Sequence, residues 1–294
     1  MTKRFENIKD LTLQRDVSAK ALTSFKAGGK ASIVLYPETK TAFTEAIKAA
    51  QGNFTVIGNG SNILMPDSDY NTPIICTVKM REITLDGSLI TASSGASLTS
   101  LALKTAQLGI KGFEFLYGIP GTVGGAVKMN AGAYGSSISD ILSTVTVATR
   151  QGDIYTLSSE ECELDYRHAR FFQSGEIILE ASFKGEKGEK TKIQNKMDDL
   201  MAQRKAKQPL EYPSAGSYFK RPEGHFAGKL IEDAGLKGLR VGGAMVSEKH
   251  AGFIINYCEA TTDDILKLEE KVRSAVFKEF GVTLECEVQK LKAD

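Results

Sequence analysis

The spacing of apolar residues along the first third of the chain predicts short strands around two helices. Apolar and β-branched runs predict strands at residues 31–35, 54–57, 74–78, 83–85 and 89–92. Phe43, Ile47 and Ala50 recur at helical spacing, which predicts a helix that begins after Pro37-Glu38-Thr39 and stops at Gly52. Ser97 and Gly109 are typical cap residues and bound a second predicted helix.

The rest of the chain continues with strands and ends on a long helix. We expect strands at residues 141–149, 153–157 and 176–183. The charged stretch 184–192 predicts a surface connection and a domain boundary, followed by a helix that ends near Lys205. A last helix is expected at 263–280 with Gly281 after its end, and a strand at 282–290. One β-α-β unit followed by mixed strands is typical of an α+β fold rather than a doubly wound sheet.

Composition and charge exclude several functional classes. The chain has 294 residues, of which 41% are hydrophobic and 25% charged, as expected for a globular protein of two or three lobes. A formal net charge of +1 gives no indication of a nucleic-acid or membrane-surface protein. Residues 1–6 show no secretory signal and no apolar run could span a bilayer, so we expect a cytoplasmic location. The four cysteines and three histidines show no metal-binding spacing, and no metal is expected.

Residues 118–135 form a glycine-rich run around which the chain is organised. Repeated glycines disfavour a packed helix or strand, but they leave the backbone open and its N–H groups exposed. Such a backbone is suited to hold a phosphate or a flat cofactor. Interleaved apolar residues such as Ile119 and Val123 argue against a flexible linker. A tight buried turn is the alternative interpretation.

A second glycine loop, Gly58-Asn59-Gly60-Ser61-Asn62, follows the predicted strand 54–57. A strand followed by a glycine-rich polar loop is a common ligand-binding arrangement in α/β units. The loop is not a dinucleotide-binding fingerprint, because Ile63 occupies the position of the third glycine, and no P-loop lysine follows. Asn-Gly is also frequent in plain turns.

Three further positions could carry chemistry. A period of two in 282–290 places Glu285 and Glu287 on the face opposite the apolar residues, either in solvent or projecting into a cleft. Tyr166-Arg167 offers a guanidinium that can bind a carboxylate with two hydrogen bonds or form a surface ion pair. Ser217 lies in a turn, but G-x-S-x-G is absent, so by itself it indicates only a turn serine.

Five segments and an opening motif carry a resemblance to a known family. They occur in order at residues 23–29, 57–64, 118–135, 166–167, 213–222 and 284–288. Together they resemble the UDP-N-acetylenolpyruvoylglucosamine reductases of bacterial cell-wall synthesis. The resemblance implies an FAD-binding fold of the vanillyl-alcohol-oxidase (PCMH) type, with α+β lobes at 1–80 and 81–192. A C-terminal α+β substrate-binding domain would occupy 205–294.

The resemblance also implies the reaction and the cofactor. NADPH would reduce a bound FAD, and the enolpyruvyl group of UDP-N-acetylglucosamine enolpyruvate would then be reduced to UDP-N-acetylmuramate in peptidoglycan synthesis. FAD would be held by two groups of residues from the two glycine loops. They are Ile57, Gly58, Asn59, Gly60, Ser61 and Asn62, together with Gly118, Ile119, Pro120, Gly121, Thr122, Gly124, Gly125, Ala126, Asn130, Ala131 and Gly132. The first loop contains no histidine, so we expect the FAD to be non-covalent.

The same resemblance assigns catalytic and substrate-binding residues. Arg167 and Glu287 would bind and polarise the substrate carboxylate, and Ser217 would protonate the α-carbon. Substrate binding is implied for Lys207 at the diphosphate, and for Arg221 and Tyr166. We expect the two loops to converge on a flavin whose N5 faces Ser217, Arg167 and Glu287.

The chain departs from the family pattern at three places. Ala169 stands where the family usually has serine, which puts a hydrogen bond from that hydroxyl in doubt, and Arg221 stands where asparagine is frequent. No tyrosine occurs between Arg167 and Glu211, so the chain resembles the shorter subclass without a tyrosine loop. Another PCMH-fold flavoprotein oxidoreductase and a non-catalytic sugar-nucleotide-binding protein are the alternatives. We expect a monomer with a small-molecule substrate and no nucleic-acid or membrane partner.

Overall fold

The computed structural model describes residues 2–293, and its chain divides into two compact units. Unit 1 consists of Met1–Arg15, Ile33–Asn59 and Thr72–Arg204, and unit 2 of Asp16–Ser32, Gly60–Asn71 and Lys205–Asp294. Two segments of the predicted first lobe are therefore part of unit 2. The division into 1–80, 81–192 and 205–294 stays a prediction, and its end residues Met1 and Asp294 lie outside the described residues.

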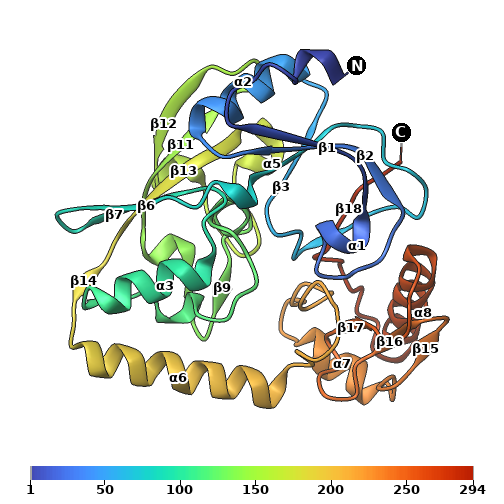
Figure 1. Cartoon of the computed structure of the whole chain (residues 1–294). Helices are drawn as coiled ribbons and strands as arrows, with labels where there is room; N and C mark the ends of the chain where they lie inside the picture. Colours follow the sequence, from blue (N-terminus) through green and yellow to red (C-terminus); the bar gives the residue numbers. More distant parts are fainter. Residues whose placement is uncertain (1, 294) are drawn as a thin grey trace. The chain divides into compact units, whose positions relative to one another are not determined.

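A four-stranded sheet lies in the N-terminal part of the chain (Figure 1). Its strands follow the order β1-β2-β5-β3, and β5 pairs in parallel with both β2 and β3. The helix α2 begins after Thr39, whose hydroxyl caps it, and shares a buried apolar cluster with the sheet. The bounds are β1 Leu11–Ser18, β2 Lys30–Pro37, α2 Lys40–Ala50, β3 Thr55–Ile57 and β5 Ile74–Cys76.

The second sheet of unit 1 has five strands in the order β12-β11-β13-β7-β6, and all neighbours are antiparallel. Two helices, α3 and α4, contribute buried residues to the large apolar cluster that includes its strands. The bounds are β6 Ile83–Asp86, β7 Leu89–Ser93, α3 Leu98–Gln107, α4 Val123–Lys128, β11 Leu142–Ala148, β12 Ile154–Ser158 and β13 Ile177–Lys184. These strands and α3 confirm the predicted pattern.

A long helix and several short elements complete unit 1. The helix α6, Lys190–Lys207, buries Ile193, Met197 and Leu200, and its last residues, from Lys205 on, belong to unit 2. It begins within the charged stretch that we predicted to be a connection, and that stretch also contains a strand. The remaining bounds are β8 Ile110–Lys111, β9 Gly132–Ala133, β10 Ser136–Ser137, α5 Phe171–Ser174 and β14 Glu186–Lys187.

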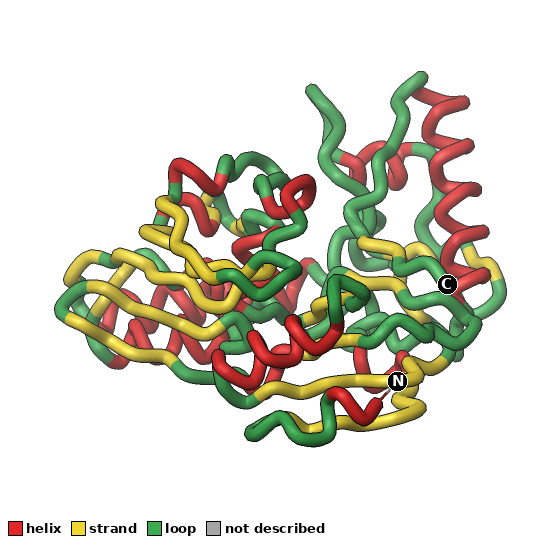
Figure 2. Tube along the Cα trace, turned by 90° about the horizontal axis from the view of Figure 1, so that it is seen from above, coloured by secondary structure: helices red, strands yellow, loops and turns green. Residues whose placement is uncertain are grey.

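Unit 2 is built on a three-stranded antiparallel sheet, β15-β16-β17, and the long helix α8. Its apolar cluster joins residues from distant parts of the chain, among them Phe25, Leu64, Tyr218 and Leu268. The bounds are α1 Ala19–Leu22, β4 Ile63–Leu64, α7 Ala227–Asp233, β15 Arg240–Val241, β16 Ala244–Val246, β17 Ile254–Asn256, α8 Thr262–Phe280 and β18 Gln289–Lys290. Helices and strands are interspersed along the chain (Figure 2), as in an α+β fold.

Two predictions of secondary structure were wrong. The strand expected at 282–290 is limited to β18, because residues 282–288 meet neighbouring segments only at isolated points such as the Phe219–Cys286 bridge. The glycine-rich run, which we expected to avoid helix, contains the helix α4. This helix forms because Val123, Ala126 and Val127 are buried in the apolar cluster, which offsets the cost of its glycines.

Candidate active site

The two glycine loops contact each other within unit 1. The side-chain amide of Asn59 donates a hydrogen bond of 3.0 Å to the carbonyl oxygen of Pro120. A Cβ atom at Gly58 would overlap the hydroxyl of Thr122, so this close approach requires glycine. The structure therefore brings Gly58 and Asn59 to the predicted run, while Gly60, Ser61 and Asn62 belong to unit 2.

Several N–H groups of the glycine-rich run bind other parts of the protein. The N–H of Val123 donates to Ala96 and that of Gly124 to Ser94, at 2.9 and 2.8 Å. Among the predicted cofactor residues, the N–H groups of Ile119, Gly121, Ala126 and Ala131 also donate to main-chain carbonyls. The run is thus a structured scaffold, and only part of its backbone is open to a ligand.

Two glycines of the run have a reason within the protein. Gly118 has a φ of 81°, in the left-handed region, and a Cβ at Gly132 would lie 2.8 Å from the carbonyl oxygen of Ser136. Real Cβ atoms do not approach so closely. The backbone conformation at Gly118 and the close packing at Gly132 therefore require glycine, whatever the run binds.

Gly125 is different, because nothing in the described part of the chain requires a glycine there. It is exposed in α4, its φ is not in the left-handed region, and a Cβ would meet only Thr122 Oγ1 at 3.7 Å. Glycine in a helix is less stable than alanine by about 0.5–1 kcal/mol. An open backbone at this point fits a ligand that lies directly against it.

Two buried hydroxyl groups lie beside α4. Ser94 Oγ and Thr122 Oγ1 have no hydrogen-bond partner among residues 2–293, and Ser94 is 2% exposed. Leaving such a group unsatisfied costs about 1–3 kcal/mol. Together with the open backbone of Gly125, these hydroxyls fit a polar cofactor held by main chain and small side chains. Sequence reasoning missed Ser94, although the cluster Ser93-Ser94-Gly95 after a predicted strand was a detectable signal.

Asn130 has a structural contact that the sequence did not indicate. Its Nδ2 donates to the carbonyl oxygen of Asp165 at 3.1 Å, and its Oδ1 accepts from the N–H of Ser139 at 3.0 Å. We predicted this residue to bind the cofactor. In the structure its buried amide connects the glycine-rich run to the turn that carries Arg167.

Arg167 lies in a tight turn of unit 1. Asp165 and His168 exchange two main-chain hydrogen bonds of 3.1 Å each around Tyr166 and Arg167. Arg167 has a φ of 53°, which is unfavourable for a residue with a side chain, and its guanidinium lies 5.4 Å from the centre of the Tyr166 ring. Strained backbone that neighbouring contacts maintain is frequent at functional sites.

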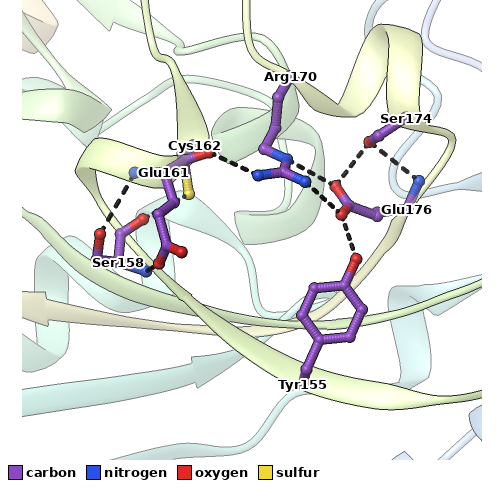
Figure 3. Close-up of polar contacts among 7 residues, drawn as sticks. All are labelled: Tyr155, Ser158, Glu161, Cys162, Arg170, Ser174 and Glu176. Atoms are coloured by element: carbon purple, nitrogen blue, oxygen red, sulfur yellow. Dashed lines mark hydrogen bonds and ion pairs between the residues drawn. The ribbon is translucent and has the colours of Figure 1, made fainter.

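A hydrogen-bonded cluster holds the segment that follows this turn (Figure 3). Glu176 accepts two hydrogen bonds from the Arg170 guanidinium, at 3.1 and 2.9 Å, and one of 2.6 Å from Ser174. The hydroxyl of Tyr155 also donates to Glu176. Arg170 reaches back to the carbonyl oxygen of Glu161 at 3.1 Å. The cluster therefore joins both ends of the loop that contains Arg167.

Replacing Arg170 with methionine is expected to lower the free energy of unfolding by about 2 kcal/mol at pH 7, because it leaves the buried Glu176 carboxylate short of a partner. Burial raises the pKa of Glu176, but hydrogen bonds from Ser174, Tyr155 and Arg170 outweigh it and hold the pKa below its usual 4.5. The stabilisation from the Arg170–Glu176 pair is fully present above the usual pKa of 4.5 and is lost as the pH falls through the lowered pKa of Glu176. The difference between wild type and variant should therefore shrink in acid, as measured by urea unfolding.

The matched control is Arg15→Met, which removes an exposed ion pair with Glu6 in the same unit. Its effect should be about 0.5 kcal/mol or less. Equal losses from both variants would contradict a stabilising role for the Arg170 cluster.

Unit 2 brings Ser217 and Glu287 together. The carbonyl oxygen of Tyr218 accepts a hydrogen bond of 2.9 Å from the N–H of Glu287. Ser217, which directly precedes Tyr218, is exposed, and Glu287 is 9% exposed. Asn62 Nδ2 donates to the carbonyl oxygen of Glu287 at 3.2 Å, so a predicted cofactor residue joins this group.

The remaining predicted residues are placed as follows. Ile57 ends β3 in unit 1, and Tyr166 is 53% exposed there. In unit 2 Lys207 is exposed, and the Arg221 guanidinium lies 4.2 Å from the centre of the Phe226 ring. Arg167 belongs to unit 1, whereas Ser217 and Glu287 belong to unit 2.

Comparisons with known proteins decide the family. Residues 31–158 match the family model of an FAD binding domain, and residues 208–291 match that of the UDP-N-acetylenolpyruvoylglucosamine reductase C-terminal domain. The UDP-N-acetylenolpyruvoylglucosamine reductase of Clostridium botulinum (strain Eklund 17B) is 46% identical over 294 residues, covering 99% of this chain and 97% of the relative. The chain belongs to the UDP-N-acetylenolpyruvoylglucosamine reductase family.

Other members of the reductase family agree with this assignment. The reductase of Caldicellulosiruptor bescii is 44% identical over 280 residues, covering 94% of this chain and 89% of the relative. The crystal structure of the reductase from Thermus caldophilus superimposes with a TM-score of 0.84 at 34% identity, covering 96% of this chain and 100% of that one. The chain is thus an α+β protein with an FAD-binding domain.

One departure from the usual reductase sequence has a structural consequence. Ala169, at the position where we expected the family serine, is fully buried in the large apolar cluster of unit 1. A hydroxyl there would need a partner that an apolar cluster does not supply.

Across residues 2–293, no helix combines the length and apolar character needed to cross a bilayer.

Proposed function

We propose that this chain reduces the enolpyruvyl group of UDP-N-acetylglucosamine enolpyruvate to form UDP-N-acetylmuramate, with NADPH as reductant. The observation that carries the proposal is the 46% identity, over nearly the whole length of both chains, to a protein named for this reductase activity. The reaction belongs to peptidoglycan synthesis. The matched FAD-binding domain and the open backbone around α4 support FAD as the cofactor.

When bound, FAD supplies the hydride, which it takes from NADPH. The residues that would hold it are those of the two glycine loops, in particular Gly58, Thr122 and Gly125, with Ser94 as an additional hydroxyl donor. The N–H groups of Val123 and Gly124 at the start of α4 are bonded to Ala96 and Ser94, so the groups that support binding of a polar cofactor are the two hydroxyls and the open backbone of Gly125. The histidine-free first loop supports non-covalent binding.

The substrate chemistry determines which side chains are needed. Addition of hydride to the β-carbon of the enol ether places negative charge on the α-carbon and its carboxylate. This charge requires hydrogen-bond donors that are already in position. We assign that role to Arg167, whose planar guanidinium binds a carboxylate with two parallel hydrogen bonds. Glu287 is assigned to the same end of the substrate, where its side chain donates a hydrogen bond only in the protonated carboxyl form.

Ser217 is assigned as the acid that protonates the α-carbon. A serine hydroxyl is so weak an acid that only a strongly basic carbon takes its proton, and it therefore does not lose the proton to water beforehand. Its exposure in a turn and its place beside Glu287 support this role. Tyr166, Lys207 and Arg221 are assigned to substrate binding, with Lys207 at the diphosphate. The monomeric state and the cytoplasmic location stay predictions.

The absorption spectrum of the purified protein tests the function. We expect a yellow protein that NADPH bleaches in the absence of oxygen, and whose colour returns when the enolpyruvyl sugar nucleotide is added. Mass spectrometry should then find UDP-N-acetylmuramate. A protein that cannot be reconstituted with FAD would favour a non-catalytic binding protein. A flavin reoxidised only by a different acceptor would favour another flavoprotein oxidoreductase.

A further inference from the structure

A buried carboxylate in unit 2 connects the two segments that carry Ser217 and Glu287. Glu269 lies on α8, and its side chain is 5% exposed. Its Oε2 accepts a hydrogen bond of 2.8 Å from the hydroxyl of Tyr218, the residue after Ser217. Its Oε1 accepts one of 2.8 Å from Nζ of Lys290 in β18, shortly after Glu287. One carboxylate therefore receives a donor from each segment.

Tyr218 is held firmly enough to transmit this contact. It is fully buried, and its ring packs edge-on against Phe25 and Phe219. Its N–H donates to Gly252 at 2.8 Å, and its carbonyl oxygen accepts from Glu287. Burial and the nearby Glu269 carboxylate raise the pKa of Tyr218, so its hydroxyl remains a protonated donor. Ser217 is joined to Tyr218 by one peptide unit, so the position of the Tyr218 ring determines the position of Ser217.

The second segment is fixed in a similar way. Lys290 lies in β18, which pairs in parallel with β4 and places Lys290 opposite Leu64. The N–H of Gln289 in the same strand donates to the carbonyl oxygen of Asn62 at 2.9 Å. The ion pair between Lys290 and Glu269 joins this strand to α8. Hydrogen bonds to an ionised group are stronger than neutral ones, and burial strengthens them further.

We propose that Glu269 is a positioning residue for the reduction, which holds Ser217 and Glu287 at a fixed separation through Tyr218 and Lys290. The inference rests on the proposed function, because it concerns the geometry of the proposed proton donor. Removing one of the two donors loosens the attachment of one segment to α8, while the main-chain hydrogen bond between Tyr218 and Glu287 remains. A displacement of about 1 Å can slow a reaction by about 100-fold.

The test measures the two half-reactions of the holoenzyme separately in Tyr218→Phe and Lys290→Met. Flavin reduction by NADPH should stay within about twofold of wild type, because it needs no proton from Ser217. Reoxidation by the enolpyruvyl sugar nucleotide should slow by about 10–100-fold. Lys290 is partly exposed, so Lys290→Met disturbs the core less than Tyr218→Phe. It therefore tests the proposal if the Tyr218→Phe variant does not fold. Equal slowing of both half-reactions, or unchanged reoxidation, would overturn the proposal.

Arg273→Met is the matched control. Arg273 Nη1 lies 3.8 Å from Glu269 Oε1, but Arg273 is on α8 itself and contacts neither catalytic segment through this pair. Its loss removes a positive charge from the same carboxylate and should leave reoxidation within about twofold of wild type. A loss as large as that of Lys290→Met would mean that charge, and not position, is what matters.

Measurements in a Ser217→Ala variant separate a positioning role of Glu269 from its contribution to the stability of the protein. In Ser217→Ala, the positioned group is absent, so adding Tyr218→Phe should slow reoxidation by less than about threefold, although it still lowers the melting temperature. The same slowing in both backgrounds would contradict the proposal. A wild-type protein that the substrate fails to reoxidise would instead refute the proposed function.

Discussion

Replacing Ser217 with alanine is expected to slow reoxidation of the flavin by the substrate by about 10²–10⁴-fold. Reduction by NADPH should remain within about twofold of wild type, because hydride transfer to the flavin needs no acid at the substrate α-carbon. Ser217 is exposed in a turn, so the change should alter the stability of the protein very little. Anaerobic stopped-flow absorbance measures the two half-reactions on the same sample.

The same turn supplies the control for this variant. Ser214→Ala removes a hydroxyl three positions earlier, where the main-chain carbonyl and not the side chain accepts the hydrogen bond from Ser24. This variant should reoxidise at the wild-type rate. If Ser217→Ala slows both half-reactions to the same extent, its hydroxyl is a structural group and another residue supplies the proton.

Replacing Gly125 with alanine is expected to affect stability and cofactor binding in opposite directions. The apoprotein should gain about 0.5–1 kcal/mol, because alanine favours the helix and its Cβ meets only Thr122 Oγ1, at 3.7 Å. The affinity for FAD should fall at least about tenfold, because the new methyl group occupies the space proposed for the cofactor. Urea unfolding of the apoprotein and quenching of FAD fluorescence measure the two effects.

Gly135→Ala is the control within the same run. Gly135 has a φ of 82° with nothing within 4 Å of a Cβ, so alanine should cost about 1 kcal/mol of stability and leave FAD affinity unchanged. Unchanged FAD affinity in Gly125→Ala would show that the cofactor does not lie against α4. Loss of apoprotein stability in that variant would show that the glycine is needed for the fold.

The sequence alone indicated elements whose signals are local. Thr39 and Ser97 cap α2 and α3, and Gly281 ends α8, because a cap acts on backbone groups only a few residues away. The apolar pattern of the strands in the five-stranded sheet was also sufficient to predict these strands from the sequence. The ordered motifs, read as a resemblance, led to the family that the comparisons confirm.

Other features were decided only by the tertiary structure, because they depend on contacts between residues far apart in the chain. The helix α4 forms in a glycine-rich run because its first N–H groups reach Ser94 and Ala96. Glu287 is buried while Glu285 is exposed, because its segment packs against Tyr218 and Asn62 rather than in a continuous strand. No local pattern carries this information, since the free energy of each arrangement comes from a partner that the fold alone brings near.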